Sequence, residues 1–147
     1  MHMNASAPED QTNTAQAIHR YWVLVVEDDA EECDYLKSLL ERNNVGVVAT
    51  ANLRDAAQRM QRQKFDCILL DLNLGHESGE KVLDLIEDRG SFNYRVPVIV
   101  MSGNLDADVI GRIKNSVRHI LVKPFNGNQL MSKLYPIFHP GKPGEAA

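Results

Sequence analysis

Five short apolar runs recur along the chain, at residues 21–26, 45–50, 65–70, 96–101 and 120–122. In the first of them the apolar positions follow one another without polar alternation, which predicts a strand that is covered on both faces of a sheet. The other four runs are candidate strands as well. The fourth run carries Pro97 near its start, where a strand tolerates the loss of a backbone hydrogen-bond donor.

Helical patterns separate these runs. Asp29 is placed to cap the first helix, with Glu32 three residues later as in a capping box, and Asn52 is placed to cap a second helix that runs to about Gln63. Further helices are expected at about 80–88, 107–114 and 127–138. Each pattern brings apolar residues to one face, as in an amphipathic helix. In the first helix this face consists of Cys33, Leu36, Leu39 and Leu40.

Strands that alternate with helices predict an α/β protein with a doubly wound, five-stranded parallel sheet flanked by five helices. Right-handed crossovers place the carboxyl ends of all the strands at one edge of such a sheet, where these folds bind their ligands. We expect one folded domain at residues 21–138. A flexible leader at 1–20 would precede it, and a flexible tail or linker stub at 139–147, rich in proline and glycine, would follow it.

Composition and charge narrow the possible classes of protein. The 147 residues are 44% hydrophobic and 24% charged, which is typical of a globular domain and excludes a collagen-like or wholly disordered chain. The net charge of −4 argues against nucleic-acid binding by the whole surface. No apolar run approaches the ~20 residues of a membrane span, and no secretory signal is visible, which favours a cytoplasmic location. Cys33 and Cys67 belong to no CxxC motif, which favours buried, reduced thiols.

Polar side chains at the strand ends carry the candidate chemistry. Glu27 and Asp28 follow the first run, Asp71 the third, Ser102 the fourth and Lys123 the fifth. Carboxylates that converge repel one another, and Mg²⁺, which prefers oxygen ligands, would relieve that repulsion. The lysine and the hydroxyl would then receive the anionic oxygens of a phosphoryl group, for which a carboxylate can be the nucleophile.

Each of these features alone has an ordinary structural explanation. Acidic residues after a strand cap the next helix and interact with its dipole, and we expect Asp29 to do only that. Ser102-Gly103 is typical of a turn. Their joint occurrence at four strand ends favours a functional site.

Four segments resemble the signatures of response-regulator receiver domains: Val25–Asp29, Leu70–Leu74, Met101–Gly103 and Val122–Phe125. The resemblance covers about residues 22–138 and implies a flavodoxin-like fold with strand order 2-1-3-4-5. It also implies a two-component phosphorelay domain in which Asp71 is the phosphoacceptor and Mg²⁺ the cofactor. A histidine kinase or a histidine phosphotransfer protein would be the phosphodonor.

The resemblance also assigns roles around Asp71. Asp28 would bind Mg²⁺ directly, Glu27 mostly through water, and Asn73 through its backbone carbonyl. Ser102 and Lys123 would contact the phosphoryl oxygens.

Among the other positions, two match the family pattern and two depart from it. Gly79 matches the glycine that closes the loop after the acceptor, and Gly103 matches a small residue that leaves the acceptor accessible. Gly75 stands where the family often has proline, which favours a more mobile loop. Ile120 stands where many members have an aromatic residue that moves inward on phosphorylation. The hydroxyl of Ser102 can still reorient, but the aromatic half of that switch is absent.

Three functions remain open at this point. The first is a phosphorylation-controlled signalling domain that acts by protein–protein interaction, either stand-alone or excised from a hybrid kinase or multidomain regulator. The second is a receiver-like scaffold that does not depend on phosphorylation, which Ile120 supports. The third is a metal-dependent phosphohydrolase with Asp71 as nucleophile. Such enzymes place a second aspartate where Asn73 stands, so we expect no enzyme beyond catalysis of the domain's own phosphorylation and dephosphorylation.

Overall fold

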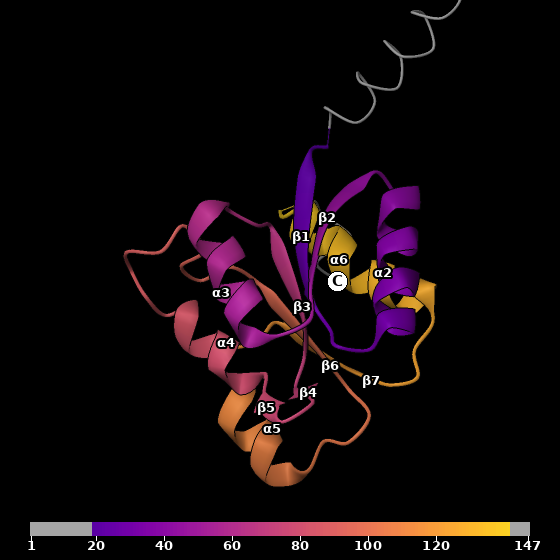
Figure 1. The fold of residues 1–147 in the computed structure, drawn as a ribbon. Coiled ribbons are helices and arrows are strands. Elements are labelled where there is room, and N and C mark those ends of the chain that lie inside the picture. Colours follow the sequence, from indigo (N-terminus) through magenta and orange to yellow (C-terminus); the bar gives the residue numbers. More distant parts are fainter. Residues whose placement is uncertain (1–18, 142–147) are drawn as a thin grey trace, which may run out of the picture.

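The computed structural model of the chain describes residues 19–141 (Figure 1). Most of the leader predicted at 1–20 and most of the tail predicted at 139–147 lie outside these residues. The two predictions of flexible ends therefore stay predictions.

Five parallel strands form the central sheet, in the order β2-β1-β3-β6-β7. Their bounds are β1 Tyr21–Val26, β2 Val45–Thr50, β3 Cys67–Asp71, β6 Val98–Ser102 and β7 His119–Val122. Counted along the five-stranded sheet, this is the order 2-1-3-4-5, so the predicted architecture is confirmed.

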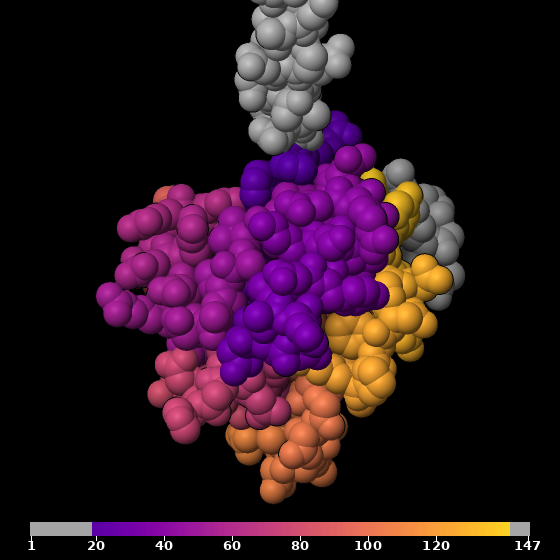
Figure 2. Space-filling view, turned by 45° about the vertical axis from the view of Figure 1, so that its right-hand side comes forward, coloured from indigo at the N-terminus to yellow at the C-terminus, as the bar shows by residue number. Residues whose placement is uncertain are grey.

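Five helices within residues 19–141 cover the two faces of the sheet. Their bounds are α2 Ala30–Arg42, α3 Leu53–Arg62, α4 Glu80–Leu85, α5 Ala107–Ile113 and α6 Gly127–Phe138. Helices α3, α4 and α5 contribute to the apolar cluster on one face, and α2 and α6 to the cluster on the other. Figures 1 and 2 show α2 beside the yellow α6. None of these helices combines the length and the apolar character that a membrane span requires.

The central strands explain the continuous apolar runs. In β1, Leu24 and Val26 belong to the cluster under α3–α5, whereas Val23 and Val25 belong to the cluster under α2 and α6. All four side chains are fully buried, because successive side chains of a strand point to opposite faces and both faces are covered. Of the two cysteines, Cys67 is fully buried, but Cys33 is only half-buried, so the prediction of a buried thiol was wrong for Cys33.

The strand and helix ends differ from the prediction around one long loop. Strand β3 begins at Cys67 and not at Phe65, whose N–H donates to the side chain of Asn93, 2.8 Å away. The N–H of Asp66 already donates to the carbonyl of Trp22 in β1, at 2.8 Å. Strand β6 begins at Val98 and not at Val96. Helix α4 was expected to reach residue 88 but ends at Leu85, and the carbonyl of the next residue accepts the N–H of Arg95. A short antiparallel hairpin, β4 Asn73–Leu74 and β5 Glu77–Ser78, was not predicted.

Asn93 holds this loop against the end of α3. The residue is 1% exposed. Its Nδ2 donates to the carbonyl oxygens of Met60 and Gln63, at 2.8 and 2.9 Å, and its Oδ1 accepts from Phe65. One buried amide therefore satisfies three main-chain groups that no regular element pairs.

Candidate functional site

The strand register brings the predicted site residues to one edge of the sheet. Val26 pairs with Leu70, so Glu27 and Asp71, the next residues of the two strands, are neighbours. Asp71 pairs in turn with Met101, which places Ser102 one step further along β6. Ser102 pairs with Val122, so Lys123 follows at the end of β7.

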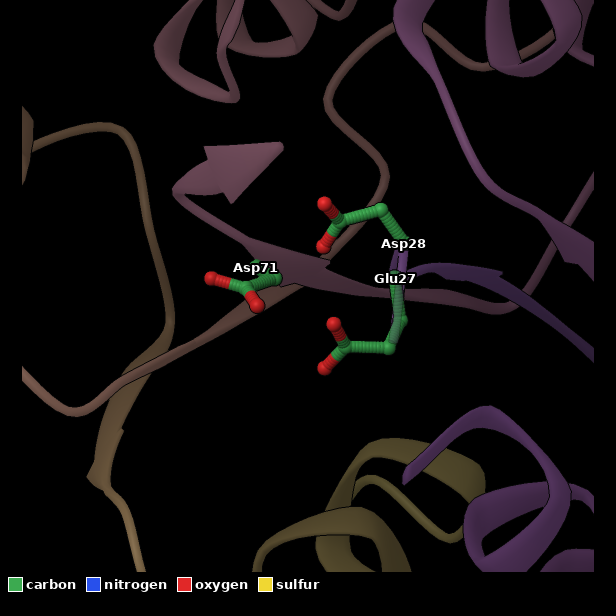
Figure 3. Close-up of side chains that lie close together, drawn as sticks. All are labelled: Glu27, Asp28 and Asp71. Carbon is green, nitrogen blue, oxygen red and sulfur yellow. The ribbon is translucent and has the colours of Figure 1, made fainter. Parts of the chain in front are cut away.

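Three carboxylates cluster at this edge. One oxygen each of Glu27, Asp28 and Asp71 can be chosen so that all three lie within 4.8 Å of one another. Figure 3 shows the carboxylates of Glu27 and Asp28, at the end of β1, turned toward the side on which Asp71 lies. Glu27 and Asp71 are 2% and 5% exposed, whereas Asp28 is open to solvent. The site thus has a buried pair of acids and one accessible acid.

Lys123 supplies the positive charge of the cluster. Its Nζ donates to Glu27 Oε1 at 2.8 Å, to Asp71 Oδ2 at 2.9 Å and to Glu32 Oε2 at 3.0 Å. Burial alone would lower the pKa of Lys123, but the three carboxylates outweigh it and hold that pKa above its ordinary value. The side chain therefore stays an ammonium ion.

Glu27 is an inward-facing acid with both oxygens engaged. Its Oε1 accepts from Lys123, and its Oε2 accepts the backbone N–H of Asp29 at 3.2 Å. Burial is the main cause that raises the pKa of Glu27 to about 7, and the neighbouring Asp71 adds to it. Asp28, in contrast, makes no side-chain hydrogen bond within residues 19–141, so its oxygens are available to a ligand.

The loop after β3 fixes the Asp71 carboxylate from its other side. Asp71 Oδ1 accepts the N–H of Asn73 at 2.8 Å. Gly79 packs directly behind this turn, and its N–H donates to the carbonyl of Leu72 at 2.8 Å. A Cβ at Gly79 would overlap the carbonyl oxygen of Asp71 and lie 2.9 Å from the Cα of Leu72, so only glycine fits.

Gly75 gives the same loop its turn, with φ of +65°. Proline cannot adopt that angle, because its ring holds φ near −65°. A proline therefore could not replace Gly75 without a change in the path of this loop.

Ser102 lies at the site, but its hydroxyl is used locally. The residue is 1% exposed, and its carbonyl accepts the N–H of Lys123 at 2.8 Å, which ties β6 to the lysine. Its Oγ accepts the N–H of Asn104 at 3.2 Å. No hydrogen bond joins this hydroxyl to the acids in the part of the chain that the structure describes.

The donor set fits a hard divalent cation. Carboxylate oxygens are the ligands that Mg²⁺ prefers, at 2.0–2.1 Å, so two ligands on opposite sides of the ion lie ~4.2 Å apart. Only one pair among three such ligands can be opposite, and adjacent ligands lie ~2.9 Å apart. The oxygens of Glu27, Asp28 and Asp71 lie within 4.8 Å of one another, so a shift of the side chains, or a water in place of one carboxylate, would complete the set. The acidic triad can therefore hold a metal ion.

Comparison with known proteins identifies the family. The family described as "Response regulator receiver domain" matches residues 23–135, which is most of the chain. The chain belongs to this family. As a receiver domain it is a module of two-component signalling and not a true enzyme, and receiver domains interact with histidine kinases.

Individual relatives extend the comparison. The receiver is 27% identical over 132 residues to the transcription factor SKN7 of Saccharomyces cerevisiae, covering 89% of this chain and 21% of that protein. It is 29% identical to the nisin biosynthesis regulatory protein NisR of Lactococcus lactis, covering 78% of this chain and 48% of that protein. The chain thus spans about a fifth to a half of the length of these relatives.

Solved structures agree with the fold. The receiver domain of sensor histidine kinase PA1611 from Pseudomonas aeruginosa is 25% identical, with a TM-score of 0.72 over 81% of this chain and 98% of that one. That crystal structure has a magnesium ion coordinated in its active site cleft. The receiver domain of a putative LuxO repressor protein from Vibrio parahaemolyticus is 27% identical, with a TM-score of 0.74 over 82% and 91% of the two chains.

Glu32 is the site residue that the sequence analysis missed. The capping box expected for α2 is only half formed. The side chain of Asp29 accepts the N–H of Glu32 as predicted, at 3.0 Å, but the Glu32 carboxylate binds Lys123 and does not turn back to the cap. An acid one helical turn after Asp28 was the signal. Its partner lies 91 residues away in the sequence, so no local pattern could assign it.

Ile120 lies in β7, partly buried against the apolar cluster under α3–α5. An aliphatic side chain thus fills this position of the receiver. Val122, two residues on, is 63% exposed.

Proposed function

We propose that this receiver accepts a phosphoryl group on Asp71 from a histidine kinase or a histidine phosphotransfer protein. The transfer depends on Mg²⁺, and the phosphorylated domain signals by protein–protein interaction. The contact of Lys123 with both Asp71 and Glu27, next to the accessible Asp28, is the observation that carries the proposal. It sets a fixed cation and a metal-binding triad around one carboxylate.

The chain's own groups suit each part of the transfer. An oxygen of the Asp71 carboxylate attacks the phosphorus of the donor's phosphohistidine. The P–N bond breaks, and its electron pair goes to the imidazole nitrogen, which takes up a proton. Lys123 offsets negative charge on the phosphoryl oxygens, and the N–H of Asn73 orients the attacking carboxylate. Water later attacks the phosphorus, which releases inorganic phosphate and restores the carboxylate.

Mg²⁺ would be held by Asp28 and Asp71 directly, by the carbonyl of Asn73, and through water by Glu27. Both Glu27 oxygens already have partners, which supports its indirect role. When bound, the ion would neutralise charge on the transferred phosphoryl group. The magnesium-bound PA1611 receiver supports this choice of metal.

The relatives suggest the kinds of protein in which this receiver could act. One relative is a transcription factor, and another is the receiver of a sensor histidine kinase. A receiver of this type therefore acts either as part of a longer regulator or kinase or as a separate protein that binds its target.

The experiment is intact mass spectrometry of the folded protein after incubation with acetyl phosphate, with and without Mg²⁺. We expect a gain of one phosphoryl group that requires Mg²⁺ and is lost in Asp71→Asn. Asp34→Asn is the matched control, because Asp34 is an exposed aspartate on α2 outside the site, and it should be labelled like the wild type. No gain under either condition would favour the phosphorylation-independent scaffold.

A further inference from the structure

All three N–H donors of the Lys123 ammonium are engaged in hydrogen bonds. A lysine ammonium carries three N–H donors, and here Glu27, Asp71 and Glu32 accept one each, at 2.8, 2.9 and 3.0 Å. Two of these partners belong to the acidic triad. The third, Glu32, lies in the first turn of α2 and has no part in that triad.

A phosphoryl group on Asp71 needs this same ammonium. Its oxygens are strong acceptors, and charge-assisted hydrogen bonds to an ammonium are stronger than neutral ones. Since all three donors are in use, one carboxylate has to give way before Lys123 can bind a phosphoryl oxygen.

Glu32 is the partner that can leave at least cost. Its side chain is 44% exposed, against 1% for Glu27 and 7% for Asp71, so water can replace the lost hydrogen bond. Glu27 is also held by the N–H of Asp29, and Asp71 by the N–H of Asn73. The carboxylate of Glu32 accepts no other hydrogen bond within residues 19–141.

We propose that Glu32 is a positioning residue that holds Lys123 in the unphosphorylated receiver and releases it when Asp71 is phosphorylated. The inference rests on the proposed function of Asp71. Glu32 competes with the phosphoryl group for one ammonium donor and adds a negative charge near an incoming anion. It therefore slows phosphoryl transfer to Asp71.

The test compares rates of phosphorylation by acetyl phosphate in the presence of Mg²⁺. An exposed ion pair is worth little, so removing Glu32 in Glu32→Ala should speed phosphorylation about 2- to 5-fold. Glu32→Gln keeps a neutral acceptor for Lys123 and should fall between the wild type and Glu32→Ala. Glu31→Ala is the matched control, because it removes the same charge from the same helical turn without touching Lys123 and should change the rate less than about 1.5-fold.

Ionic strength gives a readout that a purely structural role would not move. Salt screens partly exposed charges, so the rate advantage of Glu32→Ala should shrink between about 0.02 and 0.5 M salt. The melting temperatures of the three variants should stay close to that of the wild type, which shows that all of them are folded.

The outcomes separate the two proposals. A wild-type protein that is never labelled overturns the function proposed for Asp71 and this inference with it. A labelled wild type whose rate equals that of Glu32→Ala, or exceeds it, overturns the role of Glu32 alone. An equal acceleration in Glu31→Ala also overturns it, because the effect would then be one of general charge.

Discussion

Truncation of Asn93 should destabilise the domain far more than its place in a loop suggests. Asn93→Ala removes three hydrogen bonds, of 2.8, 2.8 and 2.9 Å, and leaves the Phe65 N–H and the carbonyls of Met60 and Gln63 without their partner. A typical hydrogen bond contributes ~1 kcal/mol net, so the three bonds together contribute about 3 kcal/mol. Water that enters the loop would reduce the loss of stability, because it would pair with some of the freed groups. Groups that stay buried and unpaired would increase the loss. We therefore expect a loss of about 2–4 kcal/mol.

The assay is equilibrium unfolding in urea, followed by far-UV circular dichroism. Asn115→Ala is the matched control, because Asn115 is exposed and makes no side-chain hydrogen bond among residues 19–141. It should stay within about 0.5 kcal/mol of the wild type. If Asn93→Ala fell in the same range as this control, the buried amide would not hold the loop as described.

Three further predictions concern the loop behind Asp71, the thiols and a surface ion pair. Gly79→Ala should cost about 1–3 kcal/mol in urea unfolding, because its new Cβ meets the main chain at Asp71. In the folded protein, Cys33 should react with a disulfide reagent, faster as pH rises, whereas Cys67 should react only after unfolding. Burial raises the pKa of both thiols, and Cys67 is fully covered. The guanidinium of Arg112 lowers the pKa of Glu80, so the small stabilisation by this pair should be present above about pH 4.5 and disappear as pH falls through the lowered pKa. Melting curves of the wild type and Glu80→Gln should therefore converge in acid.

Each of these has a control and a contrary result. Gly111→Ala on α5 adds a Cβ where nothing lies within 4 Å and should not destabilise the fold, so an equal loss at both glycines would contradict the crowding at Gly79. Cys33→Ser should abolish the reaction of the folded protein, and a remaining reactive thiol would contradict the burial of Cys67. A difference between wild type and Glu80→Gln that grows in acid would reverse the assigned sign.

Features that depend on neighbouring residues could be predicted from the sequence. Asp29 and Asn52 cap their helices because a cap is a contact over three residues, which a short pattern reveals. The proximity of the acids at the ends of β1 and β3 could also be predicted, because the carboxyl ends of parallel strands lie at the same edge of the sheet.

Features that depend on distant partners could not be predicted. The side-chain amide of Asn93 forms hydrogen bonds with residues about 30 positions away in the sequence. The side chain of Glu32 binds a lysine 91 positions away and does not bind the cap of its own helix. Phe65 lies outside β3 although it belongs to the apolar run, and its N–H pairs with that distant amide. An apolar run shows that a segment is buried, but it does not show which of its N–H groups find a strand.

The most direct test of the proposed function locates the phosphoryl group in the chain. The folded protein is incubated with acetyl phosphate and Mg²⁺, reduced with sodium borohydride, which converts an aspartyl phosphate to homoserine, and digested for peptide mass spectrometry. We expect homoserine at position 71, and none at that position when Mg²⁺ is omitted. Reduction at Asp28 in place of Asp71, or no reduced residue at all in a folded sample, would contradict it.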